Sequence, residues 1–458
     1  MSEVNSETIE ADEIKPDPVL AEFAAPKRNG IEFSLLLSKF WFFIISQKAN
    51  LNKLSVLVII NLTVAGLGFI TRVKIANTLG KADFGLFAYA FAIAAYGGAI
   101  IRFGFDRTLA RDIIHFPKRQ GQLVASSLLV RCFLFLIVTL ALVIWKFFSP
   151  AISDLTWGVV LIVLGQSMLG LEMKAVYDSW GRMSRHAIYN LIQRCLYFAA
   201  VWLMIILAPK SFSVFWLGVF TVAAVIFYII LQCNWAFKRI DFSGIKKSIF
   251  HNALVLAKGN LVIWFASLGG LCFGVINQII LKFYGGKESL GGYAAAWQIV
   301  AIAMLFLAQI SRIGRPATAR ITKPGISKKD KIKFLVKYST VMCLVVCPIS
   351  LVTTVWPESV LRLIYRPEYA SGAGALRVMG FYLLVFSIAA VAAQYLISSR
   401  QEKLYFRNVM IGGLVIVSLS FILIPKHGGL GAILSLLIAH SLLVIMNWLV
   451  VIKQLRQD

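Results

Sequence analysis

A few charged and amide side chains lie inside long apolar stretches of this chain, where an ionisable group is costly and points to binding or transport. One set recurs every three or four residues, so a helix would place it on a single face: Asn61, Ala65, Gly68 and Arg72. A second set, about 200 residues later, has a similar spacing: Asn260, Ser267, Gly274 and Gln278. Small and hydrogen-bonding residues also pack helices together, so each set fits either a polar cavity or helix packing.

The charges inside these stretches are mostly positive. Three further basic residues share the setting of Arg72, whereas acidic residues are scarce there: Arg131, Arg194 and Lys258. A long basic side chain can also reach the membrane surface, which offers a second explanation for each of them. In a poorly screened cavity such charges repel a cation and attract an anion. The residues that we predict to line an anion-binding cavity are Arg72, Asn61, Arg131, Arg194, Lys258, Asn260 and Gln278.

The sequence offers little for enzymatic chemistry. Its five histidines are scattered and form no HExxH motif, and no GxxxxGK[ST] loop for a nucleotide is present. Its six cysteines lie within apolar runs without CxxC spacing, which is typical of packing residues. We therefore predict no catalytic residues, no metal site and no cofactor, apart from a coupling ion such as H+ or Na+.

The composition is that of a membrane protein. Of 458 residues, 59% are hydrophobic and 15% are charged, against about 45–50% and 25% in soluble domains. Twelve apolar segments are long enough to cross a bilayer as helices, and we expect an all-α polytopic membrane protein. The segments are residues 54–78, 84–104, 122–148, 155–176, 187–207, 212–236, 249–281, 291–311, 334–356, 375–398, 405–425 and 430–452.

Basic residues collect in alternate connections between these segments. One set of loops is rich in Lys and Arg, as at 312–333, whereas the opposite set contains only a few, among them Lys81 and Lys287. Cytoplasmic loops carry this positive excess. We therefore expect both termini in the cytoplasm and the Lys81 and Lys287 turns on the outer side.

Two turns half a chain apart are nearly the same. "LGKADFGLFAYAFA" begins at Leu79 and "GGKESLGGYAAAW" at Gly285, so that Gly80 corresponds to Gly286 and Gly85 to Gly291, with an offset of about 206 residues. Both turns follow an odd-numbered segment. We expect two six-helix bundles related by a pseudo-two-fold axis along the membrane normal, with these glycines allowing tight turns and close helix packing.

The predicted organisation has four parts. Residues 1–30 are acidic and contain prolines, which predicts a disordered cytoplasmic tail. Residues 31–50 are apolar but short and contain Lys39, so a helix in the membrane interface is expected, with a full span as the alternative. Residues 51–245 and 246–458 then form the two bundles.

Several longer stretches carry a resemblance to a known family. They are "RVKIANTLGKADFGLFAYAFAIAAYGGAIIRFGFDRTLARDI" from Arg72, "WGRMSRHAIYNLIQR" from Trp180, "LGGYAAAWQI" from Leu290, "RPEYASGAGALRVMGFYLL" from Arg366 and "IPKHGGLGAI" from Ile424. In order and spacing they closely resemble the polysaccharide-export and O-antigen (Wzx-type) flippases of the multidrug/oligosaccharidyl-lipid/polysaccharide superfamily, over roughly residues 50–450. One departure is Asn277, where members of that family often carry Asp.

The resemblance implies a transporter rather than an enzyme. Its cargo would be polyprenyl-pyrophosphate-linked polysaccharide repeat units, moved by alternating access from the cytoplasmic to the outer leaflet of a bacterial inner membrane, alongside membrane lipids and polysaccharide polymerase machinery and without nucleic acid. Two alternatives remain: an ion-coupled exporter of drugs or other small molecules from the same superfamily, and a membrane polymerase or glycosyltransferase. Aromatic residues such as Trp297 could stack on sugars, although most fit interfacial belts.

The repeat and the loop charges generate a topological prediction. Single cysteines introduced at Ala82 and Glu288 of a cysteine-free variant should both react with a membrane-impermeant thiol reagent added from outside. Labelling of only one of the two positions would contradict the two-bundle arrangement.

Overall fold

The computed structural model describes residues 48–148, 154–242, 249–323 and 325–457, and residues 56–458 form one compact unit. The predicted tail at 1–30 and nearly all of the predicted interfacial segment at 31–50 lie outside the described residues. The described chain is helical, without strands. Ten helical segments within it are long and apolar enough to cross a membrane, which agrees with the expected all-α polytopic fold.

The helices of the first half match the first six predicted segments. They are α3 (Lys48–Leu79), α4 (Lys81–Arg102), α5 (Phe105–His115), α6 (Gln120–Phe148), α7 (Trp157–Ser167), α8 (Lys174–Ser179), α9 (Met183–Leu207) and α10 (Val214–Phe237), with short turns η1 (Pro117–Arg119), η2 (Met168–Leu171) and η3 (Pro209–Ser211). The predicted segment 155–176 is broken into α7, η2 and α8. α7 packs on both α4 and α10.

The second half contains longer helices with internal breaks. They are α11 (Ile249–Gly270), the π-helical turn η4 (Cys272–Ile276), α12 (Asn277–Ile321), α13 (Lys328–Val355), α14 (Pro357–Ile364), the turn η5 (Pro367–Gly372), α15 (Ala373–Ser398) and α16 (Glu402–Gln457). Gly286 breaks α12 and Gly428 breaks α16, each with a positive φ. Each of the six remaining predicted segments therefore has a helical counterpart.

The two turns of the sequence repeat have the same backbone conformation. Gly80 has φ 80° and ψ 171°, and Gly286 has φ 75° and ψ 176°. Only glycine adopts this region readily. A glycine with a positive φ thus reverses the chain at the same point in both halves. Gly80 precedes α4, and Gly286 precedes the second part of α12.

The repeats also pack directly against each other. A Cβ atom at Gly85 would collide with the carbonyl group of Lys287, and a Cβ atom at Gly291 would collide with the carbonyl group of Lys81. The contact is reciprocal, as a pseudo-two-fold relation requires. α4 and α12, which carry these glycines, form the most extensive helix pair in the fold.

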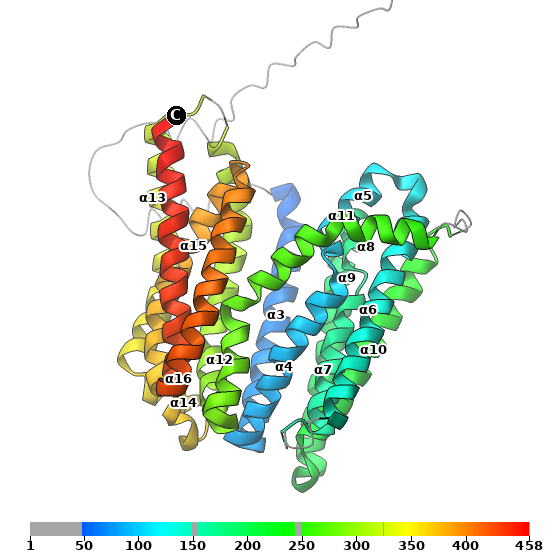
Figure 1. Cartoon of the computed structure of the whole chain (residues 1–458), viewed down its shortest axis with the longest axis vertical. Helices are drawn as coiled ribbons and strands as arrows, with labels where there is room; N and C mark the ends of the chain where they lie inside the picture. The colour runs from blue at the N-terminus through cyan, green and yellow to red at the C-terminus, as the bar shows by residue number, and fades with distance from the viewer. Residues whose placement is uncertain (1–47, 149–153, 243–248, 324, 458) are drawn as a thin grey trace, which may run out of the picture. The chain divides into compact units, whose positions relative to one another are not determined.

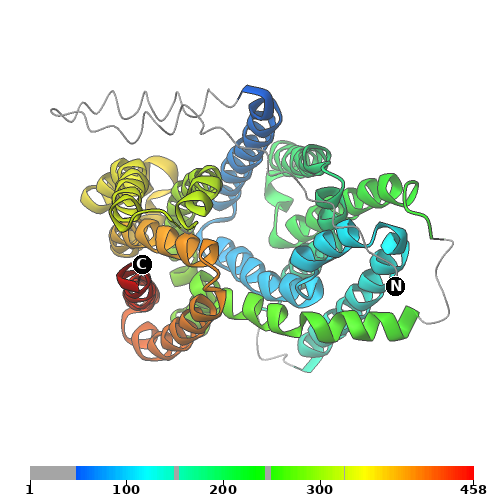
Figure 2. The ribbon, with the colours of Figure 1, turned by 90° about the horizontal axis from the view of Figure 1, so that it is seen from above.

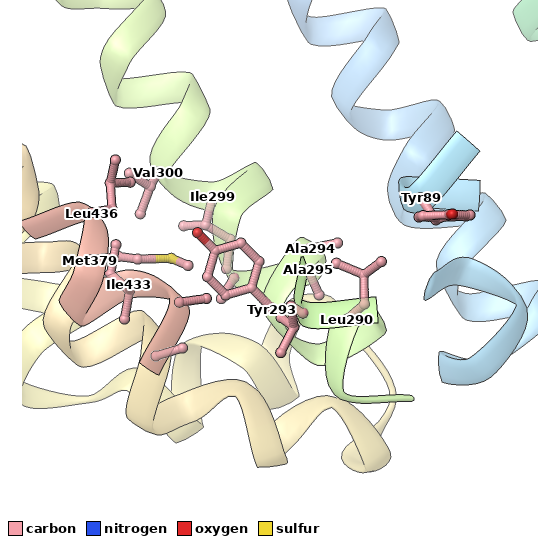
Figure 3. Close-up of a cluster of buried hydrophobic side chains, with 14 of the residues drawn as sticks. Tyr89, Leu290, Tyr293, Ala294, Ala295, Ile299, Val300, Met379, Ile433 and Leu436 are labelled. Carbon is pink, nitrogen blue, oxygen red and sulfur yellow. The ribbon is translucent and has the colours of Figure 1, made fainter. Parts of the chain in front are cut away.

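A buried cluster surrounds this pair. Figure 3 shows Tyr293 of α12 among Met379, Ile433 and Leu436 of α15 and α16, with Tyr89 of α4 lying beyond Leu290. The Tyr293 hydroxyl accepts a hydrogen bond from Asn277 Nδ2 at 3.1 Å, and the same nitrogen donates to the Ala432 carbonyl at 3.1 Å. Asn277 therefore joins α12 to α16 as a buried amide.

Helix α11 connects the two halves. It packs on α6 of the first half and on α16 of the second, and it extends across the upper part of the first half, below α5 (Figure 1). Figure 2 shows the same helix from above. A break follows it, where Phe273 leaves helical geometry and Gly274 has φ 94°. The boundary predicted at residue 245 lies outside the described residues, and α11, which follows it, contacts both halves.

The glycine contact generates a prediction about stability. Gly85→Ala or Gly291→Ala should lower the thermal unfolding temperature markedly, because backbone carbonyls cannot move aside as a flexible side chain can. Gly374→Ala is the matched control: a Cβ at this α15 glycine meets nothing within 4 Å, so that the change should be neutral or slightly stabilising. Equal melting of all three purified variants would show that the repeats do not depend on this contact.

Candidate functional site

A cavity of about 430 Å³ lies among α3, α4, α9 and α12. Its apolar lining includes Phe87, Phe91 and Leu305. Its polar lining residues are Asn61, Thr71, Arg72, Arg194, Tyr197, Gln298, Gln309 and Arg312. The volume falls within the range of about 300–1,000 Å³ that is common for small-molecule sites, and helices from both halves contribute to it.

The first predicted stripe lies on this cavity. All four of its members on α3, Asn61, Ala65, Gly68 and Arg72, are lining residues. The helical spacing that identified the stripe places them on one face, and Gly66 and Gly68 leave open space, with no atom within 4 Å of an added Cβ. The polar face of α3 therefore opens into a cavity.

The charge of the cavity is positive. Arg72, Arg194 and Arg312 line it, and among the described residues no Asp or Glu does so. The Arg72 guanidinium lies over the Phe91 ring, 5.1 Å from its centroid, and within electrostatic range of Arg194. Two guanidinium groups repel each other in a poorly screened site, so the cavity is suited to an anion that relieves this repulsion.

Two amide residues of α12 were missed by the sequence analysis. Gln298 and Gln309 line the cavity together with Arg312. Their helical spacing could have revealed them, because five lining residues of α12 recur every three or four positions, as those of the α3 stripe do: Gln298, Ile302, Leu305, Gln309 and Arg312. The Gln309 Oε1 atom is buried and has no hydrogen-bond donor within the described residues.

Arg131 lies outside this cavity and has partners of its own. It is 2% exposed and its guanidinium contacts Asp106 Oδ1 at 3.1 Å and the Glu172 carbonyl at 2.9 Å. These bonds join α6 to the start of α5 and to the residue that follows η2. Arg131 thus holds these parts of the chain together and, contrary to our prediction, does not line the cavity.

The other predicted residues are also placed elsewhere. Asn260 accepts a hydrogen bond from Thr108 Oγ1 at 2.7 Å, which joins α11 to α5. Gln278 of α12 donates to the carbonyl of Gly274 in the preceding turn η4 at 2.7 Å. Lys258 is exposed. Of the seven predicted cavity residues, the structure brings together Asn61, Arg72 and Arg194.

A second cavity, of about 420 Å³, lies on the α7 and α11 side of α4. Ser267, from the second predicted stripe, lines it together with Arg102 and Asp106. Arg102 Nε lies 3.6 Å from Asp106 and 3.9 Å from Glu172. Opposite charges are therefore paired here, in contrast to the first cavity.

Glu172 is the centre of the hydrogen-bond network behind this second cavity. Its carboxylate accepts from the Tyr228 hydroxyl at 3.2 Å and lies 3.6 Å from His186 Nε2. Helices α9 and α10 thereby reach the break between α7 and α8. The network belongs entirely to the first half.

Contacts between the halves close the end of the molecule that carries the repeated turns. Asn77 of α3 donates through Nδ2 to the Ile364 carbonyl and accepts through Oδ1 from the Arg366 N–H, both at 3.0 Å. Glu368 Oε1 accepts from the Lys81 N–H at 3.0 Å. Near the same turns, the ammonium group of Lys282 lies 3.3 Å from Asp154 Oδ2.

Comparison with protein families identifies the class of this chain. Residues 51–322 match the family model described as polysaccharide biosynthesis protein. This match covers more than half of the chain, and the chain belongs to that family. The predicted membership among polysaccharide-export flippases is thereby confirmed.

Curated relatives and solved structures agree with this assignment. The probable low-salt glycan biosynthesis flippase Agl15 of Haloferax volcanii is 19% identical over 85% of this chain and 81% of its own length. An uncharacterized membrane protein of Methanocaldococcus jannaschii is 21% identical over 83% and 79%. The structure resembles an inward-facing multidrug resistance MATE family transporter of the MOP superfamily, with TM-score 0.66, 14% identity and coverage of 86% and 96%.

A second solved structure with this fold is the lipid II flippase MurJ in an inward closed conformation. It has TM-score 0.63 and 15% identity, with 86% of this chain and 87% of that chain covered. The Haloferax volcanii relative and these two solved structures are flippases or transporters. The chain is thus a multi-pass membrane protein of the flippase and transporter class, not an enzyme.

The buried arginine generates a prediction about stability. Asp106→Asn removes the carboxylate facing Arg131 and should lower the free energy of unfolding by up to about 3 kcal/mol, because a buried charge is left without its partner. The matched control is Glu358→Gln, which breaks the exposed ion pair with Arg362 and should cost less than about 1 kcal/mol. Thermal melting of the two purified variants measures the difference, and similar melting would contradict a structural role for Arg131.

Proposed function

We propose that this protein moves polyprenyl-pyrophosphate-linked polysaccharide repeat units from the cytoplasmic to the outer leaflet. The observation that carries the proposal is the first cavity, in which Arg72, Arg194 and Arg312 face a shared space without a lining carboxylate in the described chain. A lipid pyrophosphate carries its negative charge where lipid and sugar meet. Guanidinium groups bind phosphate oxygens through two parallel hydrogen bonds.

The amides beside the arginines suit the sugar that follows the pyrophosphate. The buried oxygen of Gln309 has no donor in the described structure, and a buried acceptor without a donor is costly. A sugar hydroxyl supplies such a donor. The apolar surface of Ile302 and Leu305 between Gln298 and Gln309 offers a face for a sugar ring. Larger units would extend beyond the 430 Å³ of this cavity.

Alternating access fits the arrangement of the halves. In this proposal the Lys81 and Lys287 turns lie on the outer side of a bacterial inner membrane and both termini lie in the cytoplasm. Contacts through Asn77, Glu368 and Lys282 then close the outer end. A coupling ion, H+ or Na+, would drive the cycle, and Asp106 and Glu172 beside the second cavity are the carboxylates best placed to receive it. Polymerase machinery on the outer side would consume the product.

The rival within this superfamily is an exporter of cationic drugs. Its cargo would be repelled by the three arginines of the first cavity. Deletion of the gene separates the two functions. Under our proposal, lipid-linked oligosaccharide accumulates on the inner face and surface polysaccharide is lost. Normal surface polysaccharide together with greater sensitivity to cationic dyes would favour drug export.

The cavity generates a prediction about Arg72. Arg72→Ala should abolish export of the repeat unit while leaving the amount of protein in the membrane unchanged, and Arg72→Lys should be partly active because Lys keeps the charge but loses the planar fork. Lys258→Ala, at an exposed basic residue outside the cavity, is the control and should export normally. The measurements are surface polysaccharide and membrane protein level in a deletion strain carrying each variant. Normal export by Arg72→Ala would remove this residue from the site.

A further inference from the structure

One cavity residue is hydrogen-bonded to the segment that closes the end of the molecule. Gln298 lines the first cavity, and its Oε1 atom accepts a hydrogen bond from the Tyr365 hydroxyl at 3.1 Å. Tyr365 follows α14 and is 3% exposed. Because the hydroxyl holds the amide oxygen, the amide nitrogen of Gln298 keeps its two hydrogens for other partners.

Tyr365 is the central residue of the tripeptide that Asn77 holds. The Ile364 carbonyl before it and the Arg366 N–H after it bond the two ends of the Asn77 amide, both at 3.0 Å. We call these two bonds the Asn77 clasp. Asn77 belongs to α3 and the tripeptide to the second half, so the clasp joins the halves, at the end where α3 meets α4 (Figure 1).

Tyr369 extends the same contact. Its ring packs against that of Tyr365 with centroids 5.2 Å apart, and its hydroxyl donates to the Ala76 carbonyl at 2.8 Å. Tyr369 is fully buried. A displacement of the Tyr365 ring would therefore disturb Tyr369 and the clasp together.

Arg72 and Gln298 line the same cavity, and the Tyr365 hydroxyl lies 3.1 Å from the Gln298 Oε1 atom. An anion held by Arg72 would thus come close to this hydroxyl. A phenol has one proton to donate, and a charged phosphate oxygen is a better acceptor than a neutral amide oxygen, with bonds roughly twice as strong. Binding of the anion therefore competes with Gln298 for the Tyr365 proton.

We propose that Tyr365 transmits occupation of the cavity to the closed end: its hydroxyl passes from Gln298 to a phosphate oxygen of the cargo, and the accompanying shift releases the Asn77 clasp. This inference rests on the function proposed above. A ligand shifts an equilibrium only as far as it binds one state better than the other. Tyr365 makes the cargo bind the open state better than the closed state, because its hydroxyl bonds the cargo only when the Asn77 clasp is released.

The test uses the full chain with its native cysteines replaced and spin labels at Ala82→Cys and Leu363→Cys, on the two sides of the clasp. Leu363 is 87% exposed, so that a label there is tolerated. The probe is farnesyl pyrophosphate, added to protein in lipid nanodiscs. Pulsed electron resonance measures the distance between the labels, and titration with the same probe measures its Kd. We expect the probe to increase the population with longer distances.

Tyr365→Phe removes the hydroxyl and keeps the ring. The Kd should rise by less than about tenfold, because the bond to the charged phosphate oxygen replaces the weaker bond to Gln298 and only the difference between the two is lost. The probe-induced shift should fall by about fivefold or more. Tyr382→Phe is the matched control, a buried tyrosine whose hydroxyl lies 3.4 Å from His440 Nδ1 and away from the clasp. It should leave both quantities unchanged.

Asn77→Ala is a second variant, which acts on the clasp itself. It should lengthen the distances before any probe is added, and unchanged distances would overturn the role of the clasp. A normal shift in Tyr365→Phe, or a Kd raised by far more than tenfold, would overturn transmission through the hydroxyl. If the parent binds the probe without a shift, this inference fails and the proposed function stands. If the parent does not bind the probe, the proposed cavity fails as well.

Discussion

The close approach of α4 and α12 is the constraint on which the rest of the structure depends. Gly85 and Gly291 each lie against a backbone carbonyl of the opposite repeat, at Lys287 and Lys81. No side chain fits at these two positions, so the two halves meet backbone to backbone at the repeated turns. A cavity lies on either side of α4, and the polar faces of α3 and α12 line one of them.

Most of the fold could be predicted from the sequence, because the information is local. Apolar segments of membrane length mark the helices, and the repeated "LGKADFG" and "GGKESLGG" turns indicate two related halves. The breaks were harder to foresee. The interruption around Glu172 within the fourth segment depends on side-chain partners from α9 and α10, and such partners are set by tertiary contacts.

Helical spacing alone predicts which α3 residues share one face of the candidate cavity, whereas the ion pairs of the other basic residues cannot be predicted from spacing. The α3 stripe from Asn61 to Arg72 needed only its periodicity to be recognised as one face. Arg131 has the same sequence setting as Arg194, yet Asp106 and the carbonyl of Glu172 bind it in the structure. Arg131 is bound by Asp106 and Glu172, which lie 25 and 41 positions away in the chain. The spacing of residues within one segment carries no information about such distant partners.

Helix α11 makes the molecule asymmetric, although its two halves carry related turns. The helix belongs to the second half by sequence and is anchored to the first by the Thr108–Asn260 hydrogen bond and by its packing on α6. Helix α11 therefore links the two halves on one flank. A rotation of one half relative to the other would bend the chain at Gly274, which follows α11 and has a positive φ. Such a motion is a rotation about one hinge and not a symmetric separation of the two halves. If the cargo carries a long lipid tail, as we propose, the tail would pass on the flank opposite α11.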